Sequence, residues 1–224
     1  MKHILFIVTS TNVTGTGKQA AGYEFSEVAD PYFEFTKEGH SVDFASIKGG
    51  VPPFVGYDDI QLVSKNFKEG NGFKRLNFSH KLRDINIDAY DAIFFPGGLG
   101  PMTDMVSNPW VKDAIKKVYE SDRIIGAVCH GPVALLNVTL SNGKNLLEGK
   151  RINSFTEAEE DIDKHTLHDV IPFMLDAELK KQGALFSNTT PFDPFVVCDG
   201  NLITGQNPAS AGNVAKEMIR VLAQ

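Results

Sequence analysis

The chain has 224 residues, 42% of them hydrophobic, and a formal net charge of −6. It is long enough for one domain with a substantial core, and it has no basic cluster, which argues against nucleic acid or an anionic membrane as its main partner. No apolar run approaches the roughly 18 residues of a membrane span, and residues 1–9 lack a signal-peptide cleavage region. Because two cysteines make no disulfide framework, we expect a cytoplasmic protein. From the length we expect a single domain over residues 1–224.

Short apolar runs alternate along the chain with helical patterns. The predicted strands lie at 3–9, 41–47, 91–96, 123–128, 150–155 and 195–204. The predicted helices lie at 19–38, 110–120, 131–138, 169–181 and 208–222. The segment 48–88 interrupts the rhythm with Gly, Pro, Lys and Asn, so we expect an insertion that forms a lid or a dimer contact. The alternation predicts an α/β fold, in which a doubly wound, mostly parallel sheet is sandwiched by helices and carries its site at the carboxyl ends of the strands.

One predicted strand ends at a cysteine, Cys129, and a helix is expected directly after it. Ala127 and Gly131 are small, as the neighbours of a nucleophile on a sharp strand–turn–helix elbow must be. Backbone N–H groups at the start of the following helix would favour the thiolate form of the sulfur. The pattern therefore predicts Cys129 as a nucleophile, whereas Cys198, inside the apolar run 195–198, is predicted to be an inert core cysteine.

Glycines and acids at two other places are suited to the same site. The segment 96–101 is rich in glycine, and its backbone N–H groups could stabilise an oxyanion, although a plain turn would explain the glycines equally well. The helix expected after the first strand offers Glu24 and Glu27. Acids on a helix are usually solvated, so the sequence pattern by itself does not place either in a catalytic site.

The segment after the strand at 150–155 contains three further acids. Thr156 and Glu159 have the spacing of a capping box, which suggests that Glu159 serves only the end of a helix. Glu160 and Asp161 are then left as acids that could orient His130, the residue next to the nucleophile. Adjacent side chains on a turn diverge, so geometry must decide whether His130 reaches the cysteine.

Two other motifs are weak. Residues 15–20 match the glycine pattern of a dinucleotide-binding turn loosely, but the loop is long, and Asn12 stands where a phosphate-binding P-loop needs its first glycine. His165 and His168 could form half of a metal site, but two histidines on one helical face are more often a polar surface.

Four segments carry a family resemblance: 127–132 (Ala-Val-Cys-His-Gly-Pro), 96–100 (Pro-Gly-Gly-Leu-Gly), 148–156 and 202–210. Together they resemble the ThiJ/PfpI superfamily, and more closely its branch of heat-shock chaperones and cofactor-independent glyoxalases (glyoxalase III). The resemblance covers nearly the whole chain. It implies a flavodoxin-like fold of the class I glutamine amidotransferase type, a frequently dimeric protein, and no organic cofactor or metal.

The resemblance also implies roles for individual residues. Cys129 would be the nucleophile of a Cys-His-acid triad, with the acid at the position of Glu160. A helix glutamate would approach the sulfur, and glycines with the backbone N–H of the cysteine would form the oxyanion site. The residues at these positions are Cys129, His130, Glu160, Glu27, Gly97 and Gly98. One departure is Leu99, where close relatives usually carry histidine, and this puts the glyoxalase rate and substrate preference in question.

The expected activity is conversion of methylglyoxal and related 2-oxoaldehydes to 2-hydroxy acids, together with protection against stress or removal of glycation from proteins. The chemistry needs a thiolate for attack, a base for a carbon-bound proton and donors for an oxyanion. Two alternatives stay open: a holdase chaperone or oxidative-stress protein with a peroxide-sensitive Cys129, which would bind unfolded or glycated proteins near the phenylalanines of 54–78, and a cysteine peptidase or amidase.

Overall fold

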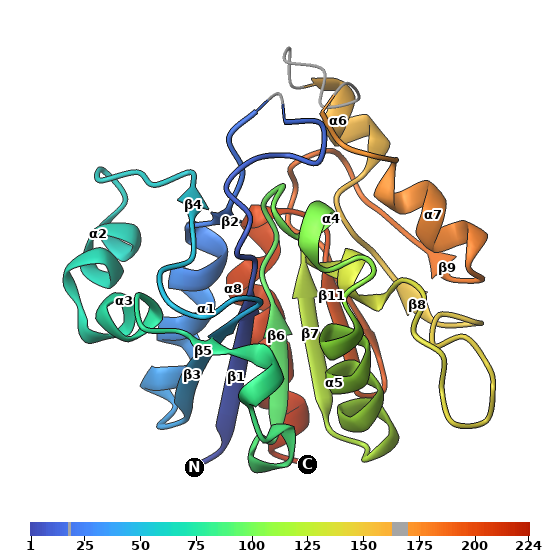
Figure 1. The fold of residues 1–224 in the computed structure, drawn as a ribbon, viewed down its shortest axis with the longest axis horizontal. Helices are drawn as coiled ribbons and strands as arrows, with labels where there is room; N and C mark the ends of the chain where they lie inside the picture. Colours follow the sequence, from blue (N-terminus) through green and yellow to red (C-terminus); the bar gives the residue numbers. More distant parts are fainter. Residues whose placement is uncertain (18, 163–169) are drawn as a thin grey trace.

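The computed structural model describes residues 1–17, 19–162 and 170–224. Within them, the centre of the fold is a seven-stranded sheet (Figure 1). From one edge to the other its strands are β10 (Val196–Asp199), β11 (Leu202–Gly205), β7 (Ile124–Val128), β6 (Ala92–Phe95), β1 (His3–Val8), β3 (Ser41–Ser46) and β5 (His80–Lys81). All neighbours run parallel except β10 and β11. The sheet confirms the predicted α/β fold with a mostly parallel sheet.

Helices cover both faces of this sheet. In Figure 1, α1 and α8 pack together behind the sheet, and α5 and α4 lie in front of β6 and β7. The α-helices are α1 (Ser26–Lys37), α2 (Leu62–Glu69), α3 (Asn71–Leu76), α4 (Pro101–Asp104), α5 (Pro109–Glu120), α6 (Glu157–Ile162), α7 (Leu175–Lys181) and α8 (Ala211–Leu222). The short 3₁₀ turns are η1 (Leu82–Asp84), η2 (Ile87–Ala89), η3 (Gly131–Leu135) and η5 (Pro208–Ser210). None of the described helices is long and apolar enough to cross a membrane.

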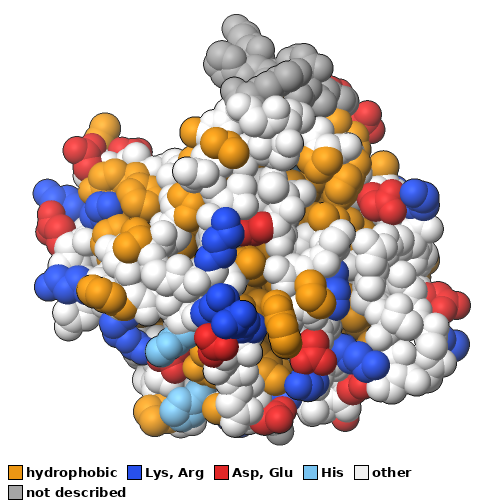
Figure 2. All heavy atoms as spheres, in the orientation of Figure 1, with side chains coloured by type: hydrophobic (Ala, Val, Ile, Leu, Met, Phe, Trp, Pro, Cys, Tyr) orange, Lys and Arg blue, Asp and Glu red, His pale blue; other side chains and the backbone are white. Residues whose placement is uncertain are grey.

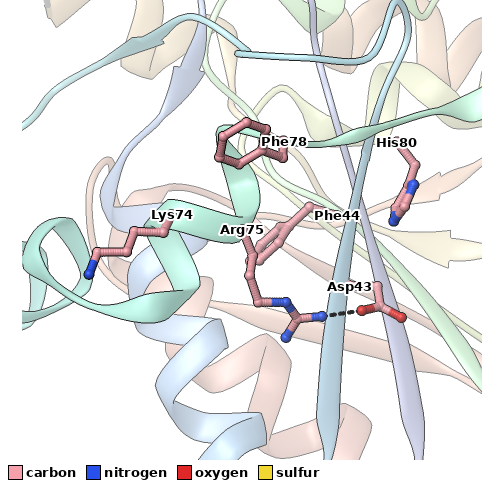
Figure 3. Close-up of a pocket in the computed structure, with 6 residues that line it drawn as sticks. All are labelled: Asp43, Phe44, Lys74, Arg75, Phe78 and His80. Atoms are coloured by element: carbon pink, nitrogen blue, oxygen red, sulfur yellow. Dashed lines mark hydrogen bonds and ion pairs between the residues drawn. The ribbon is translucent and has the colours of Figure 1, made fainter.

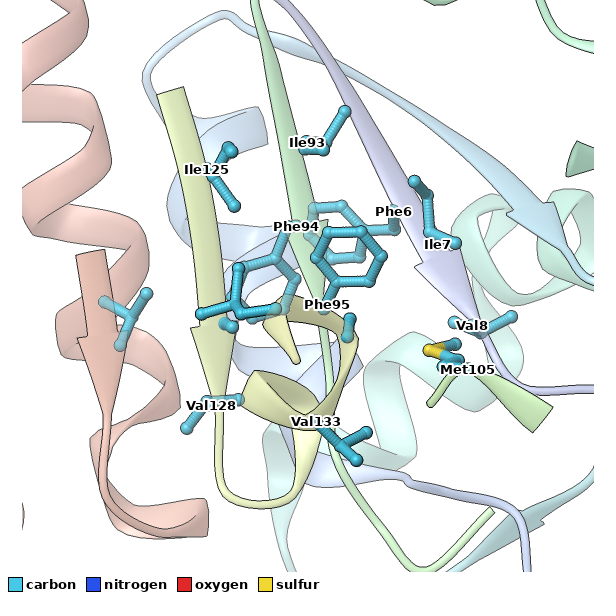
Figure 4. Close-up of a cluster of buried hydrophobic side chains, with 14 of the residues drawn as sticks. Phe6, Ile7, Val8, Ile93, Phe94, Phe95, Met105, Ile125, Val128 and Val133 are labelled. Carbon is cyan, nitrogen blue, oxygen red and sulfur yellow. The ribbon is translucent and has the colours of Figure 1, made fainter. Parts of the chain in front are cut away.

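The central strands are buried on both faces, which explains why they are almost continuously apolar. Phe6 on β1 illustrates the packing, since its ring centroid lies 4.8 Å from that of Phe94 on β6 and 5.7 Å from that of Phe44 on β3. Figure 4 shows Phe6 and Phe94 together with Val128, the last residue before the cysteine, and Val133, in the turn that follows it. The core thus holds both ends of the turn that carries Cys129.

The segment 48–88 packs beside α1 and β3. It contains β4 (Phe54–Val55), which pairs with the short strand β2 (Tyr23–Glu24), as well as α2, α3 and β5. A pocket of about 360 Å³ lies between it and β3 (Figure 3), and an ion pair of Arg75 with Asp43 spans the pocket. This pocket includes none of the predicted site residues, and the prediction of a lid or dimer contact stays a prediction.

Two predicted strands differ from the structure. The expected strand 195–204 is two antiparallel strands, β10 and β11, because Gly200 adopts a φ of 63° and the chain reverses there. The expected strand 150–155 contributes only β8 (Arg151–Ile152), which pairs with β9 (Leu185–Phe186) outside the main sheet. The rest of that segment is irregular and leads into α6.

Three predicted helices also differ. The helix expected from residue 19 begins only at Ser26, because the residues before it form a loop and β2, and Gly22 packs tightly against the Pro53 carbonyl. The helix expected at 131–138 is the 3₁₀ turn η3, after which Asn137 takes a φ of 60°. The helix expected at 169–181 begins at Leu175, after Pro172, and residue 169 lies outside the described residues.

Candidate active site

Cys129 stands on a sharp turn at the carboxyl end of the central strand β7. Its φ is 61°, a left-handed conformation that is uncommon for a residue other than glycine. A side chain at Gly131 would collide with the Phe95 carbonyl of the neighbouring strand, so the small residue expected there is required by packing. The sulfur-bearing side chain is almost closed off, since Cys129 is only 4% exposed. The geometry is that of the predicted elbow.

His130 and Glu160 are brought together with this cysteine. Cys129 Sγ lies 3.4 Å from His130 Nδ1, and His130 Nε2 lies 2.7 Å from Glu160 Oε1. With Glu160 ionised, Nε2 carries the ring proton and Nδ1 is left to accept one from the thiol. Glu160 is buried, whereas the side chain of Asp161 is exposed, so the structure places Glu160 rather than Asp161 against the imidazole.

Glu27 reaches the same sulfur from the first turn of α1. Its Oε2 accepts a hydrogen bond of 2.5 Å from the Gly97 N–H, and its carboxyl interacts with the Cys129 thiol. Glu27 is completely buried, and its Oε1 has no hydrogen-bond partner among the described residues. An unpaired buried oxygen is costly, which makes Glu27 Oε1 an exception among the buried polar atoms.

Burial decides the protonation of this pair. It raises the pKa of Glu27 well above its usual range, and the nearby Glu24 raises it further. Burial and the Glu27 carboxyl likewise raise the pKa of the Cys129 thiol, against the opposing effect of the Gly98 N–H. The expected effect of backbone N–H groups on the thiol is present in one contact, that of the Gly98 N–H, which lowers the pKa of Cys129, and burial opposes it.

The backbone donors around the sulfur differ from the expected set. The N–H of Cys129 donates to the Gly205 carbonyl at 2.9 Å, so it is not available to an oxyanion. The Gly97 N–H is occupied by Glu27, while the Gly98 N–H points to the sulfur. The N–H of His130 has no acceptor among the described residues. Gly98 and His130 thus carry the backbone N–H groups that could serve an oxyanion. The role of the His130 N–H was not predicted, because residue types do not show which backbone groups are already paired.

Glu24, the other acid noted before the first helix, is on β2 rather than on that helix. Its carboxyl lies against Gly56 of the 48–88 segment and acts electrostatically on both Glu27 and Cys129. Burial raises the pKa of Glu24 to about 7, although N–H groups at the start of α1 oppose the shift. A second carboxyl that binds a proton near neutral pH therefore borders the site.

The remaining candidates lie elsewhere. Leu99 is partly buried and packs on the core. Cys198 is on the edge strand β10 and partly exposed, so the prediction of a core cysteine is wrong. Residues 15–17 and 19–20 form no helix start, which removes the nucleotide-binding motif. His165 and His168 lie outside the described residues, and in the part that is described no group of three metal-ligating side chains occurs.

Comparisons with known proteins agree with this fold. Residues 19–221 match the DJ-1/PfpI family. The glutathione-independent glyoxalase HSP31 of Saccharomyces cerevisiae is 31% identical, over 99% of this chain and 98% of the relative. The crystal structure of glyoxalase III from Candida albicans has a TM-score of 0.88 at 25% identity, covering 98% and 97% of the two chains. That of Rapid Encystment Protein 24 kDa from Francisella tularensis has a TM-score of 0.94 at 35% identity, covering 99% of each chain. The chain belongs to the DJ-1/PfpI family, and its relatives at about 30% identity include glutathione-independent glyoxalases.

Proposed function

We propose that the protein is a cofactor-independent glyoxalase that converts methylglyoxal and related 2-oxoaldehydes to 2-hydroxy acids. The observation that carries the proposal is the convergence of two groups on one sulfur: His130 Nδ1 at 3.4 Å from Cys129 Sγ, and the buried carboxyl of Glu27 on the same thiol. A nucleophile with an adjacent base and a neutral acid is the set that a proton transfer through an enediol requires. The named activities of the relatives add support.

The first step is attack of the sulfur on the aldehyde carbon. His130 Nδ1 takes the thiol proton as the C–S bond forms, and the former carbonyl oxygen becomes the hydroxyl of a hemithioacetal. Ionised Glu160 stabilises the resulting imidazolium through its hydrogen bond to Nε2. The N–H groups of Gly98 and His130 are the donors nearest to the developing oxyanion.

The second step moves a proton between the two carbons. The hemithioacetal carbon loses its proton and the neighbouring ketone carbon gains one, through an enediol. The hemithioacetal hydroxyl gives up its proton to become the thioester carbonyl and the ketone oxygen takes one up, which leaves a thioester of a 2-hydroxy acid. Glu27 is suited to this exchange, because its free Oε1 is unpaired and its raised pKa lets it hold and return a proton. Water then cleaves the thioester to the acid and restores the thiol. The sum is addition of one water to the 2-oxoaldehyde, with no net oxidation.

Methylglyoxal turnover without glutathione tests the proposal, with D- and L-lactate measured separately. We expect activity in the wild type and a loss of at least about 1000-fold in Cys129→Ser and about 100-fold in Glu27→Gln. Leu99→His serves as a comparison, because it restores the histidine of close relatives and should leave activity intact or raise it. A wild type that makes no lactate contradicts the proposal, and hydrolysis of peptide substrates would then favour a cysteine peptidase or amidase.

One further observation favours a holdase as the second candidate. Four large apolar side chains of the segment 48–88 are more than two-thirds exposed, and Figure 2 shows hydrophobic atoms at the surface in this part of the molecule. These residues are Val51 (73% exposed), Ile60 (86%), Leu62 (72%) and Phe78 (81%). Such patches are suited to unfolded chains. Suppression of client aggregation should survive Cys129→Ala and fall in Ile60→Ser/Leu62→Ser; equal suppression by that double variant argues against this role for the patch.

A further inference from the structure

Glu159 is completely buried, and its carboxylate accepts five hydrogen bonds. Oε2 accepts the N–H of Thr156 at 3.0 Å and its hydroxyl at 2.9 Å, as the capping box predicts. Oε1 accepts three more, from the Phe192 N–H at 2.8 Å, Gln206 Nε2 at 3.1 Å and Asn207 Nδ2 at 2.9 Å. A helix cap needs only the Thr156 pair. The other three donors come from distant segments and call for a different explanation.

Two of those three donors, Gln206 and Asn207, belong to a segment that also contacts the turn of the nucleophile. Gln206 and Asn207 directly follow β11, whose last residue, Gly205, accepts the N–H of Cys129 at 2.9 Å. Asn207 is itself tied in place, since its Oδ1 accepts the Ser210 hydroxyl at 2.9 Å. Residues 205–210 therefore contact the nucleophile turn on one side and Glu159 on the other.

A strained loop residue takes part in the same network. Phe192 has a φ of 65°, a conformation that persists in a bulky residue only where the surroundings enforce it. Its N–H is held by Glu159, and its ring packs edge-on against Phe155, with centroids 6.1 Å apart. Phe155 in turn packs on the His130 imidazole, at 4.8 Å. The network thus also contacts His130, through the ring of Phe155.

Glu160 itself has few contacts that could aim it. Its Oε1 bonds to His130, and its Oε2 has no hydrogen-bond partner among the described residues. The direction of the Glu160 side chain is therefore set by the short helix α6 that carries it. Neighbouring side chains on a helix point about 100° apart, so fixing the direction of Glu159 also fixes that of Glu160.

We propose that Glu159 is a positioning residue for the triad: it anchors α6 to residues 205–207 and so directs Glu160 onto His130. Glu159→Gln should break this anchor with little change of shape. The change to glutamine replaces one acceptor oxygen by an NH₂ donor. Apart from the Thr156 hydroxyl, the atoms that contact the Glu159 carboxylate are N–H donors, which cannot accept a hydrogen bond from that NH₂. At least one buried N–H is then left unpaired and α6 shifts.

The turnover test of this positioning role rests on the proposed glyoxalase activity. We expect Glu160→Gln to lower kcat/KM about 100-fold or more and Glu159→Gln to lower it about 10- to 100-fold. Because Glu159 acts through Glu160, the double variant should match Glu160→Gln alone within about threefold. Losses that multiply in the double variant would show that Glu159 acts by another route and would overturn the proposal.

A second measurement does not depend on turnover. The pH profile of Cys129 alkylation by iodoacetamide, followed by mass spectrometry of its peptide, should shift to higher pH in Glu160→Gln, because the imidazolium partner of the thiolate is destabilised. Glu159→Gln should shift it in the same direction. Gln206→Met, which removes one of the five donors to Glu159 together with the bonds of Gln206 to Thr189, should shift it by less. If the wild type makes no lactate, the proposed function fails while this profile still decides the role of Glu159.

Asp176→Asn is the matched control. Asp176 is also a buried carboxylate near a helix start, where it accepts the Ala177 N–H at 2.8 Å and pairs with Lys180, but it has no contact with the triad. The Asp176→Asn change should lower the thermal stability of the protein and leave the pH profile of Cys129 alkylation unchanged. A wild-type profile in both Glu159→Gln and Gln206→Met, with a shifted profile in Glu160→Gln, would overturn the positioning role.

Discussion

The surroundings of Cys129 and the segment 48–88 are held together by different forces. Around the cysteine, buried carboxyls are fixed by directional hydrogen bonds, such as those that Glu27 and Glu160 make to Gly97 and His130. The segment 48–88 is held by aromatic rings, with Phe67 at its centre. Directional bonds fix atoms to fractions of an ångström, whereas ring packing supplies stability with more tolerance. Chemistry and stability should therefore be separable by mutation.

Among the changes that compare the two regions, Gly97→Ala should have the largest effect on activity. The added Cβ would lie 2.6 Å from the backbone N of His130 and 2.9 Å from both Cys129 Cβ and Glu27 Oε2. None of these groups can move without disturbing the sulfur, so kcat/KM should fall at least about 100-fold. Gly212→Ala on α8 is the control, because its nearest contact would be an ordinary 3.8 Å to Asp30 Cβ. Wild-type turnover in Gly97→Ala would contradict the tight geometry.

Phe67→Ala probes the other region. Phe67 is 1% exposed. Its ring centroid lies 5.1 Å from that of Tyr32, 5.7 Å from that of Phe25 and 6.1 Å from that of Phe73. Its loss should lower the free energy of unfolding by about 3–5 kcal/mol in urea titrations, through lost burial and a cavity. The folded fraction should keep kcat within about threefold. A loss of turnover as deep as that of Gly97→Ala, in folded protein, would mean that the two regions are not separable.

The smallest expected effect concerns Glu24, which lies where the two regions meet. Burial raises its pKa from 4.5 to about 7, so the folded protein keeps a proton that the unfolded chain releases over that interval. Unfolding free energy therefore falls as pH rises from about 4.5 to about 7. The glutamine in Glu24→Gln does not titrate. The free energy of unfolding of this variant, relative to that of the wild type, should therefore rise over this pH window by about 1–2 kcal/mol, allowing for partial exposure.

Chemical denaturation of Glu24→Gln and the wild type at pH 5 and pH 8 measures this difference. Glu38→Gln, at the exposed end of α1, is the control and should show the same offset from the wild type at both values. The same difference in unfolding free energy between Glu24→Gln and the wild type at both pH values would contradict a raised pKa at this position.

Local signals in the sequence were enough for the central sheet and for the elbow. Runs of buried apolar residues predicted β1, β6 and β7, because strands covered on both faces must be apolar throughout. Small residues on either side of Cys129 predicted the turn. The spacing of Thr156 and Glu159 predicted the capping box, since its hydrogen bonds join residues three apart.

Tertiary structure alone decided how these pieces meet. Glu27 and Glu160 lie 102 and 31 positions from Cys129 in sequence, and only the folded arrangement of α1, β7 and α6 brings Glu27 to the sulfur and Glu160 to the neighbouring His130. The pairing of the Cys129 N–H with Gly205 and the raised pKa values of Cys129 and Glu27 likewise follow from burial and distant contacts. Residue types carry chemical capacity, but burial and long-range geometry determine which protons and acceptors are available.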